Sequence, residues 1–195
     1  MKTYVLHRFI DWRRVAPLQI AEQLWREPVD IAAWAQLAWD DEGFRVRLTA
    51  REANIRAEET GPLGRPWQDS CLEFFFAPMP ADPRYINIEF NPNACCCLGL
   101  GDGLARTRLV PDRDWLEPRA FRLEGGWGVE YRVPFALVRQ LFPGFDPRPG
   151  DIIRANCYKC GDLTEREHYL AWNPVTCATP NFHQPCDFGR MMLAG

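Results

Sequence analysis

The sequence predicts an all-β fold, an antiparallel β-sandwich of the jelly-roll or immunoglobulin-like kind with one or two short helices. Three observations favour it. Short segments with apolar residues at every second position recur along the chain, as half-buried strands require. The 17 prolines and 14 glycines lie mainly between those segments, where turns are needed. Strands do not alternate with long helical segments, which argues against a parallel sheet.

About ten short strands are expected from these patterns. Residues 71–77 form an apolar run broken only by Glu73, which is typical of a strand covered on both faces. In residues 85–91 the side chains alternate, so Asn87 and Glu89 share the face opposite the apolar one. The expected strands cover residues 3–9, 44–50, 71–77, 85–91, 94–100, 126–133, 152–158, 169–172 and 189–193, and a short one that carries Arg106 and Arg108.

Two segments have helical spacing. Residues 15–25 repeat apolar side chains at intervals of three and four, and residues 134–141 open with a proline at a suitable first position. Neither segment is long enough to form a layer of its own. With no linker, internal repeat or low-complexity tract, the chain is expected to form a single domain over residues 1–195.

Composition narrows the possible partners. The chain has 195 residues, a formal net charge of −3 and 47% hydrophobic residues, which suits a globular protein with its own core. No broad basic field is present, so nucleic acid is not an expected partner. No apolar run approaches the roughly 20 residues of a membrane span, so no membrane partner is expected either.

The first residues alternate between polar and apolar side chains and lack the continuous apolar stretch of a signal peptide. The sequence as written therefore predicts a cytoplasmic protein, or a secreted one if a leader has been removed. It leaves the oligomeric state open, with a homo-oligomer among the alternatives.

The chain holds eight cysteines. Cys95, Cys96 and Cys97 are consecutive, and neighbours in a strand point to opposite faces, so they do not form a simple disulfide set. Most cysteines are expected to be buried free thiols in a reducing compartment. An alternative is a zinc site or redox pair built from Cys157-x-x-Cys160, with His183-x-x-Cys186 as the other half, although such a lone motif is a weak signal.

Two aromatic, proline-bracketed passages indicate a binding module. One runs through residues 66–76 and contains Trp67 just after a Gly-Arg-Pro loop signature; the other covers residues 180–189 and contains Phe182 and His183. Aromatic rings on a loop rim can pack against the C–H faces of sugars, while polar neighbours orient the hydroxyl groups. The simpler alternative is that Trp67 only caps the sandwich.

Polar residues on the expected strands extend this hypothesis. Glu73 lies in an apolar strand and is expected to face a groove or a cation, with Arg84, Arg106 and Lys159 as the candidate cations. Asn87 is expected to extend the same surface, unless it is simply solvent-exposed. Arg106 is a candidate for binding sugar hydroxyls or for surface ion pairing.

Calcium is a further possible ligand of this chain. Its candidate sites are the oxygen-rich loops that contain Asp40, Asp41 and Glu42, or Asp112 and Asp114. Such clusters of aspartates also serve simply to form turns.

The ordered series of residues 40–46, 67–75, 85–91, 150–152 and 156–162, followed by the Trp-Asn-Pro to Phe-Gly ending, resembles the family-9-like carbohydrate-binding modules, which are DOMON-like β-sandwiches. This resemblance implies a saccharide ligand gripped between two aromatic rings, and often bound calcium. By position, Trp67 resembles the first stacking tryptophan of that family. Glu73 resembles the carboxylate that accepts hydrogen bonds from sugar hydroxyl groups. Phe182 and His183 stand where the second tryptophan is expected, so stacking should be weaker or sugar preference different.

Two other functions are alternatives to saccharide binding. A sugar-modifying enzyme would use Glu73 and Glu89 as its carboxyl pair, but the sequence lacks the Gly-x-Ser-x-Gly, His-Glu-x-x-His and phosphate-loop motifs. A heme- or metal-binding sensor would need a methionine or histidine pair that faces one pocket. The sequence therefore favours a non-catalytic carbohydrate-binding module.

Overall fold

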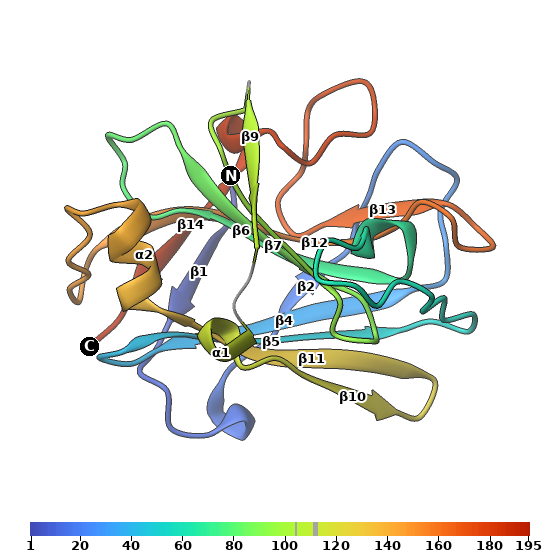
Figure 1. Ribbon diagram of the computed structural model, residues 1–195, viewed down its shortest axis with the longest axis horizontal. Helices are drawn as coiled ribbons and strands as arrows, with labels where there is room; N and C mark the ends of the chain where they lie inside the picture. The colour runs from blue at the N-terminus through green and yellow to red at the C-terminus, as the bar shows by residue number, and fades with distance from the viewer. Residues whose placement is uncertain (104, 111–112) are drawn as a thin grey trace.

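The computed structural model describes residues 1–103, 105–110 and 113–195, which fold into two stacked sheets (Figure 1). The larger sheet has nine strands, in the order β1-β14-β12-β6-β7-β8-β9, and β13 and β3 extend it beside β12. Its strands are β1 (Thr3–Leu6), β3 (Glu22–Gln23), β6 (Cys71–Ala77), β7 (Tyr85–Phe90), β8 (Cys96–Gly101), β9 (Arg106–Leu109), β12 (Ile152–Gly161), β13 (His168–Ala171) and β14 (Gly189–Leu193).

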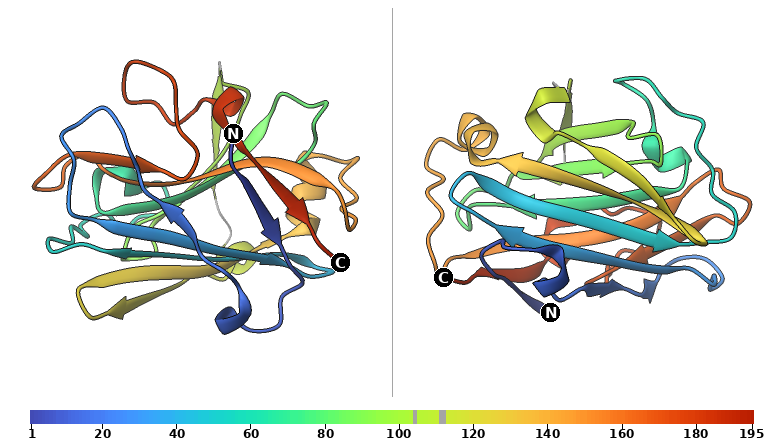
Figure 2. Two further views of the ribbon diagram at one scale, coloured as in Figure 1. Left: turned by 180° about the vertical axis from the view of Figure 1, so that it is seen from behind. Right: turned by 90° about the horizontal axis from the view of Figure 1, so that it is seen from below.

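The smaller sheet has five strands, in the order β10-β11-β5-β4-β2. Neighbouring strands are antiparallel in both sheets except for β1 and β14, which lie side by side and parallel near the two termini (Figure 2). The predicted all-β sandwich is therefore confirmed. The strands of the smaller sheet are β2 (Leu18–Ile20), β4 (Ala32–Trp39), β5 (Gly43–Arg51), β10 (Arg119–Leu123) and β11 (Gly126–Pro134).

Helices are short. The helix expected at residues 134–141 is present as α2 (Phe135–Leu141), and α1 (Arg113–Leu116) is a single turn. The prediction of a helix at residues 15–25 was wrong, because that segment forms β2 and β3 instead. The backbone of β2 pairs with β4, and its two apolar side chains face the core while Gln19 points outward. Tertiary pairing thus outweighs a local helical pattern that is too short to form a helix by itself.

The larger sheet is covered on both faces. Phe74 and Phe76 of β6 belong to the main core between the sheets, whereas Cys71 and Phe75 alternate to the opposite face. There Phe75 joins a second apolar cluster whose other members include Tyr85, Tyr158, Phe182 and Phe188. Burial on both sides explains why β6 reads as an almost continuous apolar run.

Six of the eight cysteines are buried, as expected; Cys177 is half-buried and Cys186 is exposed. Trp172, directly after β13, is also buried in the main core. Among the described residues, no helix combines the length and the apolar character that crossing a membrane requires.

A charged cluster is buried at one end of the sandwich. The Lys159 ammonium, with no exposed surface, lies 3.2 Å from a carboxylate oxygen of Glu52 and donates a hydrogen bond of 2.9 Å to the Cys160 carbonyl. The His168 Nε2 atom lies 2.7 Å from the same ammonium. Burial, followed by the charge of Lys159, lowers the pKa of His168 to about 4, so this ring is neutral at neutral pH and its Nε2 atom accepts a hydrogen bond from the Lys159 ammonium.

Candidate functional site

A cavity of about 640 Å³ opens on the outer face of the larger sheet. Residues 180–183, in the loop that leads from β13 to β14, line one side of it. The strands β6, β7, β8 and β12 form its floor. Its walls come from β9, from β13, and from four segments outside the strands that contain Trp25, Trp67, Asp162 and residues 180–183. The six residues chosen from the sequence all line it: Trp67, Glu73, Asn87, Arg106, Phe182 and His183. Their role in binding stays a prediction, but the structure brings them to one place from distant parts of the chain.

Two glutamates form the centre of the floor. Glu73 of β6 and Glu89 of β7 are direct cross-strand partners, and only 3% and 4% of their surfaces are exposed. Burial, then the nearby Cys160 and Glu89, raises the pKa of Glu73 well above its usual value. Burial also raises the pKa of Glu89 to about 7, although Arg106 opposes this shift. The floor therefore offers both acceptor oxygens and, when a proton is held, an O–H donor.

The sequence left open whether Asn87 is solvent-exposed, and the structure shows that it is buried. Its Nδ2 atom donates a hydrogen bond of 2.9 Å to Glu89 Oε1, which fixes that carboxyl group. Gly99 on β8 faces Asn87, and a Cβ atom added there would lie 2.3 Å from Asn87 Oδ1. The glycine thus makes room for the amide. Asn87 acts in this arrangement mainly by orienting Glu89.

The expected cation partners of Glu73 are otherwise engaged. Arg84 pairs with Asp82 at 2.6 Å and Lys159 pairs with Glu52, and no ion pair among the described residues includes Glu73. Arg106, the third candidate, approaches His183 Nε2 at the rim of the cavity.

His183 is held by two neighbours. Its Nδ1 atom lies 2.8 Å from the Tyr85 hydroxyl, and the Arg106 guanidinium donates to its Nε2 atom. Burial and then the charge of Arg106 lower the pKa of His183 to about 3, which keeps the ring neutral and able to accept that hydrogen bond. Arg106 itself is exposed on β9 and lines the cavity, so its other N–H groups can reach a ligand.

Trp67 lies in a 3-10 turn (Pro66–Gln68) immediately before β6, as its loop context predicts. Its indole is half-buried and lines the cavity. The Arg108 guanidinium lies 5.4 Å from the ring centroid, at cation–π distance. Arg108 also donates hydrogen bonds to the carbonyls of Leu63 and Gly64, so it ties the loop before Trp67 to β9.

Phe182 does not form an exposed stacking wall. Only 7% of its surface is exposed, and its ring stacks on Tyr158 with a centroid distance of 4.1 Å. Trp25 and Tyr169 contact it at centroid distances of 5.5 and 5.9 Å, and both are half-buried and line the cavity. The more accessible aromatic surface beside Phe182 therefore belongs to Trp25 and Tyr169, with Phe182 as their support.

Trp25 is the most informative residue that sequence reasoning missed. Its φ of 55° is a left-handed backbone conformation that is strained for a bulky residue. Its indole N–H donates a hydrogen bond of 2.7 Å to the Cys177 carbonyl. Its helical spacing placed it on a helix that does not exist. Other lining residues that were not singled out are Cys97, Gly99, Thr107, Asp162, Tyr169, Pro180 and Asn181.

The calcium candidates Asp40 and Asp41 lie in the turn between β4 and β5. Asp40 accepts hydrogen bonds from the backbone N–H groups of Glu42 and Gly43, and its other oxygen lies 2.7 Å from Arg45. Asp41 pairs with Arg8 at 2.7 Å. Because guanidinium groups already neutralise both carboxylates, this turn does not fit a calcium site. Asp112 lies outside the described residues, and so does the side chain of Asp114.

The zinc half-site proposed from Cys157 and Cys160 was wrong. Residues three apart in a strand point to opposite faces, so Cys157 packs in the main core while Cys160 packs in the outer cluster. The other half of the expected zinc site, His183 and Cys186, does not suit a metal either. His183 forms hydrogen bonds with Tyr85 and Arg106, and Cys186 is exposed.

The family model of carbohydrate-binding family 9 matches residues 5–115 and 124–193. The chain belongs to carbohydrate-binding family 9. This membership agrees with the resemblance noted in the sequence. A comparison with curated proteins found no match.

Solved structures agree with the family-9 fold. A candidate carbohydrate-binding protein from Bacteroides uniformis ATCC 8492 is 23% identical, with a TM-score of 0.82 over 98% of this chain and 99% of that one. A family-9 module from Caldicellulosiruptor kristjanssonii in complex with cellotriose is 16% identical, with a TM-score of 0.70 over 100% of this chain and 94% of that one. A family-9 module from Caldicellulosiruptor kristjanssonii in complex with glucose is also 16% identical, with a TM-score of 0.70 over 100% of this chain and 96% of that one. At these identities the likeness shows the fold.

Proposed function

We propose that this family-9 module binds a saccharide in the cavity without catalysing its conversion. The observation that carries the proposal is the convergence of aromatic rings, carboxyl groups and guanidinium groups on one open cavity. Its volume of about 640 Å³ lies within the range of about 300–1,000 Å³ that is usual for small-molecule sites. The solved family-9 module in complex with cellotriose and with glucose supports the choice of ligand class.

Each group has a distinct role in this proposal. Trp67 packs against the C–H face of a sugar ring, and Trp25 and Tyr169, supported by Phe182, supply the second apolar surface. Glu73 and Glu89 accept hydrogen bonds from hydroxyl groups, with Asn87 holding Glu89 in place. Arg106 and Arg108 donate at the rim. Calcium takes no part in these contacts. Saccharide affinity measured by titration should therefore be the same in the presence of added calcium and after calcium has been removed.

An enzyme that uses Glu73 and Glu89 is not favoured. Glycosidase carboxyl groups stand on opposite sides of the bond that they cleave. Here the two glutamates are direct cross-strand neighbours, so they emerge side by side from the same face of one sheet and do not face each other across the cavity. A heme or metal sensor with a methionine or histidine pair is not favoured either, because His183 is the one histidine among the described lining residues and no methionine is among them.

Replacing Trp67 with alanine tests the proposal. We expect saccharide affinity to fall at least about 30-fold, which corresponds to the 2 kcal/mol or more of an aromatic anchor. A glycan array would identify the ligand, and calorimetry would measure the affinity of both proteins. Trp34→Ala is the matched control, because Trp34 is half-buried on β4 of the other sheet and does not line the cavity.

Two results would contradict the proposal. One is that no mono- or oligosaccharide of the array binds to the unmodified chain. The other is that Trp67→Ala and Trp34→Ala have equal effects on affinity while both variants remain folded.

A further inference from the structure

Two thiols and a carboxyl group meet beneath the floor of the cavity, which Glu73 and Cys160 line. Cys71 and Glu73 are two residues apart on β6 and so share one face, and Cys160 is the direct cross-strand partner of Cys71 on β12. The Cys160 thiol donates to Glu73 Oε1 at 3.0 Å. One ligand atom from each of Cys71, Glu73 and Cys160 lies within 4.8 Å of the other two.

The three groups are buried without a compensating cation. Their exposed fractions are 0% for Cys71, 3% for Glu73 and 2% for Cys160. No ion pair among the described residues includes Glu73, and a buried carboxylate without a cation is costly. Burial also raises the pKa of all three groups. A bound divalent cation would stabilise the ionised forms of these ligands.

We propose that Cys71, Cys160 and Glu73 form a three-ligand site for zinc or another thiophilic divalent metal ion. Tetrahedral zinc holds sulfur at about 2.3 Å and oxygen at about 2.0–2.2 Å, so its ligand atoms lie roughly 3.5–3.8 Å apart. The separations of up to 4.8 Å seen here would need only side-chain rotation. Two sulfur ligands favour zinc and disfavour calcium, which takes oxygen ligands.

The proposal has consequences for protons and for the cavity. On binding, each cysteine thiol loses its proton to solvent, and so does Glu73 if it is protonated, because metals bind thiolates and carboxylates. Three protein ligands leave a fourth position open. Glu73 and Cys160 line the cavity, so that position faces it and is available to water or to a hydroxyl group of a ligand. The metal site does not depend on the proposed sugar binding.

Cobalt titration of the reduced protein tests the site, with Cys177→Ser and Cys186→Ser introduced first to remove the accessible thiols. We expect one Co²⁺ per chain, intense near-ultraviolet thiolate-to-cobalt charge-transfer bands, and displacement by Zn²⁺. In this background, Cys71→Ala or Cys160→Ala should weaken Zn²⁺ binding at least about 100-fold, since even the loss of an outer-shell partner costs 10–100-fold. Glu73→Gln, which keeps the side-chain shape, should weaken binding but retain the sulfur bands.

Cys157→Ala is the matched control because Cys157 is equally buried on the same strand but points into the main core. It should keep the cobalt spectrum. The proposal is overturned if no stoichiometric thiolate–cobalt bands form, or if the bands survive removal of both Cys71 and Cys160. It is also overturned if Cys157→Ala, folded by circular dichroism, loses the bands as fully as Cys71→Ala does. Trp67→Ala should retain the bands, which separates failure of the metal site from failure of sugar binding.

Discussion

Replacing Lys159 with methionine is expected to lower the free energy of unfolding by about 3–5 kcal/mol, the usual cost of removing one partner from a buried ion pair. Lys159 and Glu52 are 0% and 5% exposed, so water cannot replace the lost partner. Among the described residues, the Glu52 carboxylate would keep only its hydrogen bonds from Trp127 Nε1 at 2.7 Å and from the Ser70 hydroxyl at 3.1 Å. Urea denaturation followed by circular dichroism measures the change.

A double variant separates the loss of charge balance from the loss of packing. Adding Glu52→Gln to Lys159→Met removes the uncompensated carboxylate, so we expect it to restore part of the lost stability. Lys2→Met is the exposed control: Lys2 pairs with Glu22, but its side chain is 41% exposed, and the expected change is under about 1 kcal/mol. A loss below about 1 kcal/mol for Lys159→Met would show that the ion pair does not stabilise this fold.

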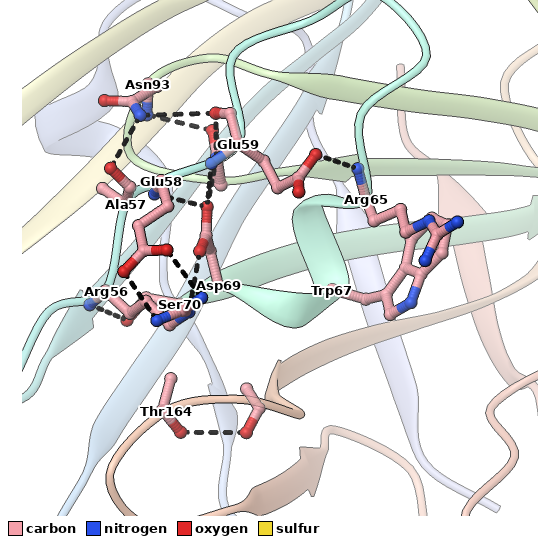
Figure 3. Close-up of polar contacts among 12 residues, drawn as sticks. Arg56, Ala57, Glu58, Glu59, Arg65, Trp67, Asp69, Ser70, Asn93 and Thr164 are labelled. Atoms are coloured by element: carbon pink, nitrogen blue, oxygen red, sulfur yellow. Dashed lines mark hydrogen bonds and ion pairs between the residues drawn. The ribbon is translucent and has the colours of Figure 1, made fainter.

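Replacing Asp69 with alanine should both destabilise the fold and weaken saccharide binding. Asp69 is 1% exposed, and its Oδ2 atom accepts hydrogen bonds of 2.8 Å from the backbone N–H groups of Glu58 and Glu59 and from Asn91 Nδ2. Its other oxygen lies 3.2 Å from Arg56 Nε. Figure 3 shows this carboxylate at the centre of the loop that leads to Trp67. We expect a loss of about 3–5 kcal/mol, because two backbone N–H groups and the Asn91 amide lose a buried charged acceptor, while the half-buried Arg56 keeps only Glu58 as an ion-pair partner among the described residues.

Sugar affinity should fall in Asp69→Ala even though Asp69 does not line the cavity. The reason is that the loop no longer holds the Trp67 ring in position. Glu58→Ala serves as control, because Glu58 also pairs with Arg56 but has a 68% exposed side chain. Denaturation and calorimetry measure the two effects. Unchanged sugar affinity in a folded Asp69→Ala protein would show that this network does not position Trp67.

Much of the fold was predictable because strand patterns are local. The expected strands at residues 71–77 and 189–193 agree with β6 and β14 residue for residue. By contrast, β4 was missed, since four of its eight residues are alanines, which carry little strand signal. Its strand conformation comes from pairing with β5 on one side and β2 on the other.

The candidate site was predictable where a residue is informative in its own segment. Glu73 is a carboxylate in an apolar run, and Trp67 follows a loop signature, so both were identified before the structure was known. Trp25 and Tyr169 were not, because their place at the cavity depends on contacts with Phe182, which is distant from Trp25 in the chain.

The order of polar and apolar residues alone determined that the chain forms a two-sheet sandwich and that Glu73, Asn87 and Glu89 leave their strands away from the apolar core. Only the tertiary structure decided that this polar face is enclosed and not bathed in water, and that Cys71, not Cys157, lies beside Cys160. Alternation along a strand is a property of neighbouring residues, whereas strand pairing and the covering of a face depend on segments that meet only when the whole chain folds.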